Sequence, residues 1–146
     1  MIIRKFEMSD YDNVYALWMR TPNMGFNNID DSREGIEKYF NRNPQTSFVA
    51  EHNGEIIGVI LSGHDGRRGF IIHTCVASEN RRNGIGRQLL DTALDALKKE
   101  GITKVALLTF QYNEDGNAFW EQMDFTARPD LVYRNKALID MIRIDT

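Results

Sequence analysis

The stretch that most constrains this chain runs from Phe70 to Leu97 and has the pattern of a strand, a glycine-containing turn and a helix. The apolar run Phe70–Val76 comes first, and apolar residues recur at helical spacing from Ile85 onward. Between them, the two glycines at positions 84 and 86 allow the backbone to approach a ligand closely. The first N–H groups of a helix have no partner inside the helix and carry partial positive charge. This order of elements therefore predicts an anion site suited to phosphate.

The turn departs from two other phosphate-binding patterns. A dinucleotide-binding turn needs a third glycine, where this chain has Leu89, and a P-loop needs Gly-Lys followed by Ser or Thr. Arg81, Arg82 and Arg87 add positive charge where a pyrophosphate would lie. A plain strand-to-helix turn with surface arginines is the alternative interpretation.

The pattern Arg81-x-x-Gly84-x-Gly86 resembles the coenzyme A loop of the GNAT N-acetyltransferases. A second pattern of that family, N-x-x-A-x-x-F-Y-E-x-x-G-F, is similar to residues 113–125. The positions that match in register are Asn113, Phe119, Glu121 and Phe125. The resemblance covers nearly the whole chain. It implies an enzyme that takes acetyl-coenzyme A (acetyl-CoA) as co-substrate and passes the acetyl group directly to a primary amine of a small molecule or peptide.

The resemblance also implies which residues bind the cofactor. Backbone N–H groups of the loop would hold the pyrophosphate, and backbone groups at the end of the preceding strand would pair with the pantetheine arm. The implied cofactor-binding residues are Cys75, Val76, Arg81, Arg82, Asn83, Gly84, Ile85, Gly86, Arg87, Asn113 and Trp120. The Val76 N–H would also polarise the thioester carbonyl and stabilise the oxyanion. No cluster of residues has metal-ligand spacing.

The acid and base are less well defined. Trp120 stands where many family members have the tyrosine that protonates the leaving thiolate, and an indole cannot release its proton at useful pH. Tyr133, then Tyr112, or direct protonation by water, are the alternatives. For the base, Glu79 precedes the loop and His73 lies in the strand, although a packed histidine is the commoner outcome there. A water-relayed base is also open.

The rest of the chain predicts an α+β fold. Strands are expected at 2–6, 46–51, 55–61, 70–76 and 105–110, from residue 125 and at 136–144, and helices after Ser9, from 31 or 32, and at 85–100 and 115–123. Asn53-Gly54 predicts a tight hairpin turn, and Ser9 with Asp12 resembles a capping box. By resemblance, the sheet is mixed and mostly antiparallel, with a splayed parallel strand pair and about four flanking helices. Asp124 replaces the glycine that ends the last helix in the family.

Length and composition favour one domain spanning residues 1–146. A net charge of −3 argues against nucleic acid as a partner, and Cys75, the single cysteine, excludes an internal disulfide. No apolar stretch approaches about 18 residues and no signal peptide is recognisable, so we expect a cytoplasmic protein without a membrane partner. The last strand would offer an edge for a homodimer. An acyl-CoA-binding sensor that has lost catalysis is the alternative function, which Trp120 leaves open.

Overall fold

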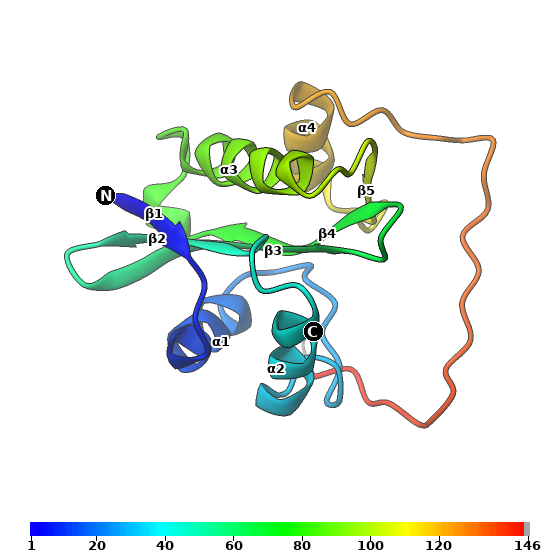
Figure 1. Ribbon diagram of the computed structural model, residues 1–146, viewed down its shortest axis with the longest axis horizontal. Coiled ribbons are helices and arrows are strands. Elements are labelled where there is room, and N and C mark those ends of the chain that lie inside the picture. The colour runs from blue at the N-terminus through cyan, green and yellow to red at the C-terminus, as the bar shows by residue number, and fades with distance from the viewer. Residues whose placement is uncertain (145–146) are drawn as a thin grey trace.

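The structure, a computed structural model, describes residues 1–144 and contains one five-stranded sheet in the order β1-β2-β3-β4-β5. The strands are β1 (Ile2–Lys5), β2 (Phe48–His52), β3 (Glu55–His64), β4 (Gly69–Val76) and β5 (Val105–Leu107). The α-helices are α1 (Tyr11–Met19), α2 (Arg33–Arg42), α3 (Ile85–Lys99) and α4 (Glu114–Gln122). Strands β1 to β4 pair antiparallel and β5 pairs parallel to β4. Helices α3 and α4 lie on one face and α1 and α2 on the other, which confirms the α+β prediction (Figure 1).

The start of the first helix differs from the prediction. A short 3-10 turn, Met8–Asp10, precedes α1, and the capping box joins Glu7 to Asp10 instead of Ser9 to Asp12. The Glu7 backbone N–H donates to Asp10 Oδ2 over 2.9 Å. Arg4 fixes this carboxylate from β1, since its two terminal nitrogens donate to Asp10 over 2.9 and 2.8 Å. The cap therefore forms where a strand arginine can reach it.

The structure confirms the predicted hairpin turn and shows how two of the helices begin and end. Asn53 and Gly54 have φ values of 51° and 78°, as a tight hairpin turn between β2 and β3 requires. Ser32 caps α2 by accepting a hydrogen bond from the Gly35 N–H over 3.1 Å. Gly101 follows α3 with φ 81°, the left-handed conformation that ends a helix.

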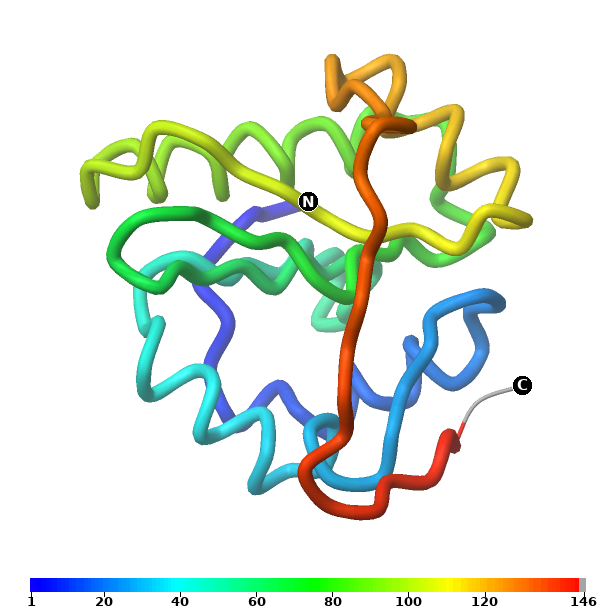
Figure 2. The backbone as a smooth tube through the Cα atoms, turned by 90° about the vertical axis from the view of Figure 1, so that its right-hand side faces the viewer, coloured from blue at the N-terminus to red at the C-terminus, as the bar shows by residue number. Residues whose placement is uncertain are grey.

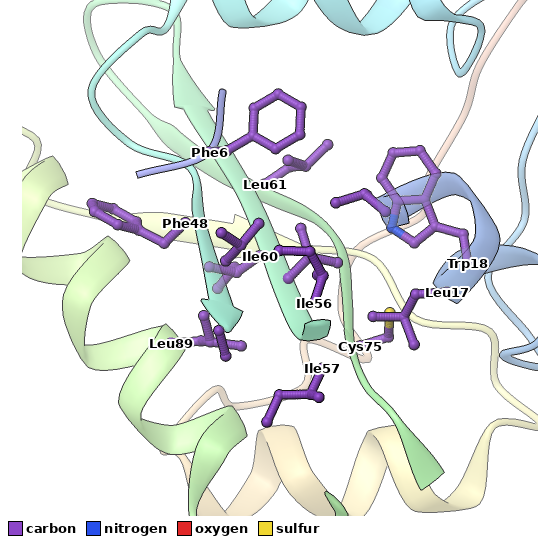
Figure 3. Close-up of a cluster of buried hydrophobic side chains, with 14 of the residues drawn as sticks. Phe6, Leu17, Trp18, Phe48, Ile56, Ile57, Ile60, Leu61, Cys75 and Leu89 are labelled. Atoms are coloured by element: carbon purple, nitrogen blue, oxygen red, sulfur yellow. The ribbon is translucent and has the colours of Figure 1, made fainter. Parts of the chain in front are cut away.

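The core lies between the sheet and both helical layers. Figure 3 shows side chains of β3, such as Ile60, at the centre of the buried cluster, with Trp18 of α1 on one side and Leu89 of α3 on the other. These three side chains are at most 1% exposed. Burial on both faces explains why β3 is nearly continuously apolar in sequence.

Strand β4 contains a β-bulge. Val59 is paired with Cys75 and Leu61 with Ile72, so β4 carries one residue more than β3 over this stretch. His73 lies in the bulge with φ 50°, a conformation that residues with side chains rarely adopt. A Cβ on Gly69 would meet Leu97 of α3. The side chain of Val76 lies close to Gly86, which is also in α3, so positions 69 and 76 both face this helix. Positions 69 and 76 thus share a face although their separation is odd, which an unbulged strand does not allow.

The C-terminal part of the chain contradicts the prediction. No strand begins at Phe125 or spans Lys136–Ile144; in the described chain the only pairing in this region is an isolated bridge between Asn27 and Arg143. Strand β5 also ends at Leu107 instead of Phe110. Every residue from 126 to 143 is exposed, and we call this segment the C-terminal strap. The strap leaves α4 and crosses to the α1–α2 side, standing apart from the sheet (Figures 1 and 2). A strand forms only where a neighbouring edge pairs with it, and no edge of the same chain lies against the strap.

Within residues 1–144, no helix has the length and apolar character needed to cross a membrane.

Candidate active site

The open side of β4 is the central feature of the site. Strand β5 pairs with β4 only from Gly69 to Ile71, so within residues 1–144 no strand pairs with β4 on that side from Ile72 to Val76. The Ala77 N–H donates to the Ile57 carbonyl of β3 over 2.8 Å. Since N–H groups alternate in direction along a strand, the Val76 N–H points away from β3, toward the gap. The predicted splayed parallel pair is thus present, with the Val76 N–H facing it.

The glycine loop lies directly beyond this gap. Arg82 and Gly84 have φ values of 66° and 76°, so the loop turns sharply before α3. Gly84 is the N-cap of α3 and supplies no side-chain cap, and the first turn of α3 contains no acidic residue. Its leading N–H groups are therefore not neutralised by a side chain, which suits an incoming anion.

The predicted loop residues are brought together by this turn. Arg81 curls back, and its Nε donates to the Val76 carbonyl over 3.3 Å. The side chain of Asn83 donates to the Asn80 carbonyl over 3.3 Å and steadies the loop. Ile85, the first residue of α3, is buried, whereas positions 81 to 84 and 87 are exposed. The loop consequently presents backbone and arginine groups to solvent.

The second family pattern packs against the first. A Cβ on Gly86 would lie 3.1 Å from the ring of Phe119, so glycine lets α4 pack closely on α3 and a side chain there would crowd the ring. Asn113 caps α4, and its Oδ1 accepts from the Gly116 N–H over 3.0 Å. Trp120 contacts the rings of Phe119 and Phe125 at centroid distances of 4.9 and 5.3 Å. Asn113 and Trp120 thus have structural contacts that account for them, and their cofactor-binding roles stay predictions.

The end of α4 follows the family pattern despite its substitution. Asp124 adopts φ 66°, the left-handed conformation usually supplied by glycine. The Phe125 N–H then donates to the Trp120 carbonyl over 2.9 Å. This turn returns Phe125 to the aromatic cluster at the edge of the core.

Two side chains near the loop are poorly suited to proton or acyl transfer. The pKa of Glu79 is lowered, first by its own backbone N–H and then by Arg20, whose Nη1 lies 3.1 Å from its carboxylate. A lowered pKa makes Glu79 a weaker base. Burial raises the pKa of the Cys75 thiol to about 12, so Cys75 is not an activated nucleophile. Among residues 1–144, no three His, Cys, Asp or Glu side chains are grouped to hold a metal.

His73 and Asp31 form a buried histidine–carboxylate pair that the sequence alone does not reveal. His73 Nε2 lies 2.5 Å from Asp31 Oδ1, and their side chains are 13% and 5% exposed. The Asn27 N–H donates to Asp31 Oδ2 over 2.8 Å, and the Tyr11 hydroxyl donates to the Asp31 carbonyl over 2.7 Å. The sequence predicts that a helix starts at residue 31 or 32; in the structure Asp31 precedes the Ser32 cap and its side chain is buried. Only the fold brings these residues, 42 positions apart, together.

The two tyrosines suggested as the acid are both exposed. Tyr133 is in the C-terminal strap and is 63% exposed, and Tyr112 is 61% exposed and stacks on Phe110 with ring centroids 5.1 Å apart. Neither has a described contact with Val76 or with the glycine loop. Their role as acid stays a prediction.

The chain is similar to known proteins in both sequence and structure. An acetyltransferase of Pectobacterium atrosepticum is 31% identical over 140 residues, which are 96% of this chain and 97% of that protein. The solved structure of Ard1 from Thermoplasma volcanium has a TM-score of 0.76 and 21% identity, covering 86% of this chain and 82% of its own. That of a diaminobutyrate acetyltransferase from Paenibacillus lautus, with L-2,4-diaminobutyric acid and coenzyme A, has a TM-score of 0.70 and 23% identity, covering 84% and 73%. The family model of the GNAT acetyltransferases matches residues 11–125, and the chain therefore belongs to the GNAT acetyltransferase family.

Proposed function

We propose that this acetyltransferase moves the acetyl group of acetyl-CoA directly to a primary amine within a ternary complex. The observation that carries the proposal is the Val76 N–H, which faces the gap beside β4 immediately before the uncapped N-terminus of α3. A pantetheine arm is an extended chain with amide groups, so it can pair with the open edge of β4 as an added strand would. The pyrophosphate then reaches the leading N–H groups of α3.

The same geometry gives Val76 a chemical role. When the amine nitrogen attacks the thioester carbon, negative charge develops on the carbonyl oxygen. A fixed N–H donor stabilises that charge without reorganising. The C–S bond then breaks, the thiolate of coenzyme A leaves with its electron pair, and the attacking nitrogen loses its extra proton to the base or to water as the amide forms. No acyl-enzyme is expected on Cys75, because this buried side chain is mainly a neutral thiol and therefore a poor nucleophile.

For removal of the amine proton, the geometry favours His73 over Glu79. Attack requires a neutral amine, so an ammonium substrate must first lose a proton to a base or a water chain. His73 lies in the same strand as Val76, and Asp31 fixes the orientation of its ring. Glu79 is instead paired with Arg20 in an exposed position. We therefore assign the base, or the end of its water relay, to His73.

The leaving thiolate needs no dedicated acid in this scheme. Trp120 packs among aromatic rings and has no proton to give at useful pH. Water at the open gap is able to protonate the sulfur, which was one of the alternatives open from the sequence. Tyr133 stays the side chain to test if an acid is required.

The acceptor class is a primary amine of a small molecule or peptide. The diaminobutyrate acetyltransferase that shares this fold was solved with an amine substrate and coenzyme A, which supports amine acceptors in general. Coenzyme A binding there also supports acetyl-CoA as the donor here. No observation favours the non-catalytic sensor.

The test is a calorimetric titration of acetyl-CoA into the wild type, Gly84→Trp and Gly54→Trp. Both glycines have positive φ values, 76° and 78°, and open space around the Cβ position, so both substitutions strain the backbone alike. We expect Gly84→Trp to abolish binding and Gly54→Trp, in the β2–β3 turn, to retain it. A screen of primary amines for release of free thiol then identifies acceptors. Absence of binding to the wild type would overturn the proposal.

A further inference from the structure

The last described residues return to the loop between α1 and α2 and pair with it. The Ile142 N–H donates to Asn28 Oδ1 over 2.7 Å, and the Asn28 N–H donates to the Ile142 carbonyl over 2.9 Å. The Ile144 N–H donates to the Phe26 carbonyl over 3.1 Å. The pairing has the form of a short antiparallel ladder, and Figure 2 shows it where the red end of the chain runs beside the blue loop.

The residue at the centre of this ladder, Asn27, is directed at Asp31. Asn27 forms the antiparallel bridge with Arg143, and its two neighbours in the loop turn their backbone groups toward the end of the chain. Because backbone groups alternate in direction along a paired segment, the Asn27 N–H points the other way. There it donates to Asp31 Oδ2 over 2.8 Å. The ladder therefore fixes the direction of a hydrogen bond to the carboxylate that orients His73.

The residue before Asn27 reaches the other member of the pair. The centroid of the Phe26 ring lies 4.5 Å from that of His73 and 4.9 Å from that of Trp18. Phe26 is 1% exposed, so the loop is held against the core at this point. His73 and Asp31 thus each contact a residue of the same short segment, and this segment is the one to which the end of the chain is bonded.

The rest of the loop sets its own shape but not its position relative to β4. In the described chain, the loop contains no helix or strand. Asn27 Oδ1 accepts from the N–H groups of Ile29 and Asp30 over 2.9 and 2.8 Å, which makes a local turn. The Tyr11 hydroxyl anchors the loop from α1 through the Asp31 carbonyl. The ladder is the anchor on the other side, and it comes from the far end of the sequence.

We propose that residues 142–144 position the His73–Asp31 pair by fixing residues 26–28. They act through the Asn27 N–H and the Phe26 ring, so they are positioning residues. The exposed C-terminal strap is then the connection that carries the end of the chain from α4 back to this loop (Figure 1). The consequence for acetyl transfer rests on the proposed role of His73 as the base, whereas the positioning itself does not.

The first experiment observes the pair directly, by NMR of isotope-labelled histidine rings in the wild type, Ile142→Pro and Ile139→Pro. Proline at 142 removes the N–H that donates to Asn28. Ile139 is the matched control, because the two isoleucines are 67% and 62% exposed and no hydrogen bond of the Ile139 N–H is described. His73→Gln identifies the His73 signals among the three histidines. We expect Ile142→Pro to change the His73 signals alone and Ile139→Pro to leave all of them unchanged. Unchanged His73 signals in Ile142→Pro would refute the positioning.

A second pair of variants changes the acceptor of the same hydrogen bond. Asn28→Ala removes the side-chain oxygen and should alter the His73 signals as Ile142→Pro does. Asn28→Asp retains an oxygen that accepts from the Ile142 N–H, so its His73 signals should stay close to those of the wild type. An equally strong change in both variants would mean that this hydrogen bond does not hold the loop, and the proposal would fail.

The last experiment connects the positioning to catalysis. We expect kcat for amine acetylation to fall about tenfold in Ile142→Pro and to stay near the wild-type value in Ile139→Pro, with unchanged acetyl-CoA affinity in both. In the His73→Gln background, Ile142→Pro should cause no further loss, since both act through the same side chain. A tenfold loss that persists in that background would contradict the proposal. Altered His73 signals with a wild-type kcat in Ile142→Pro would support the positioning and count against His73 as the base.

Discussion

His73 Nε2 and Asp31 Oδ1 lie 2.5 Å apart and join strand β4 to the loop before α2. The His73 ring is also enclosed by Trp18 and Phe26, with centroid distances of 5.1 and 4.5 Å. These contacts hold His73 at φ 50°, which costs backbone energy. A strained, oriented histidine in the strand that carries Val76 fits a role in proton transfer.

Substituting His73→Gln tests that role. We expect kcat for amine acetylation to fall by about 10²–10³-fold, within the range attributed to general base catalysis. The affinity for acetyl-CoA should change little, because the proposed donor site is formed by the backbone of β4 and the glycine loop and does not include the His73 side chain. Steady-state thiol release and calorimetry measure the two quantities separately.

Asp31→Asn keeps the ring partner but removes its charge, so we expect a smaller loss, about tenfold. Glu79→Gln is the control and should retain activity; full activity in His73→Gln would exclude the histidine from catalysis.

The pair of Arg4 and Asp10 predicts a loss of stability in acid. Burial raises the pKa of Asp10, but the hydrogen bonds from Arg4 and Glu7 outweigh it, so the pKa lies below the ordinary 3.8. A depressed pKa contributes stability above the unfolded value, and that contribution is lost as the pH falls from 3.8 through the folded pKa. We expect Asp10→Asn to lower the free energy of unfolding at pH 7 by about 2 kcal/mol. Urea titrations at pH 7 and pH 3 should show the difference shrinking in acid; a constant difference would contradict this origin.

The Cys75 thiol provides a probe of core opening. Its pKa is raised from 9.0 to about 12 by burial, so at pH 8 the native protein holds on the order of 1,000-fold less thiolate than the unfolded chain. We expect alkylation by iodoacetamide to be slow in native protein and rapid in denaturant, as followed by mass spectrometry. Rapid native alkylation would mean that β4 is accessible from the α1 side.

The contact between Gly86 and Phe119 should be sensitive to a single methyl group. A Cβ at position 86 would lie 3.1 Å from the ring, so Gly86→Ala crowds the packing of α3 on α4. We expect a loss of about 1 kcal/mol in stability. In the double variant Gly86→Ala/Phe119→Leu the added methyl group should cost less than it does alone, as a double-mutant cycle by chemical denaturation would show. Additive effects would indicate that the crowding lies elsewhere.

The glycine loop and the hairpin were predictable because their determinants are local. Gly84 and the Asn53-Gly54 turn require backbone conformations that few other residues adopt, and the structure places positive φ values at these positions. The helix order followed from apolar spacing in the same way. The capping box expected at Ser9 and Asp12 lies instead at Glu7 and Asp10, in the 3-10 turn before α1, where Arg4 of another element binds Asp10.

The remaining features depend on contacts across the fold. No spacing rule connects His73 with Asp31, since they meet only after the loop before α2 has packed against β4. The strands expected from Phe125 and at Lys136–Ile144 had suitable residues but lacked a neighbouring edge in the same chain. Strand propensity describes how a segment fits a sheet, and the sheet must be there to receive it.

The extra residue in β4 changes which positions of the strand face α3. Upstream of His73, odd positions such as Gly69 face α3; downstream, even positions such as Val76 do. If the same eight residues of β4 paired with β3 without a bulge, Val76 would lie on the opposite face and its N–H would point toward β3. The direction of this one backbone group, which the proposed acetyl transfer uses, therefore depends on the bulge that accommodates one extra residue in β4.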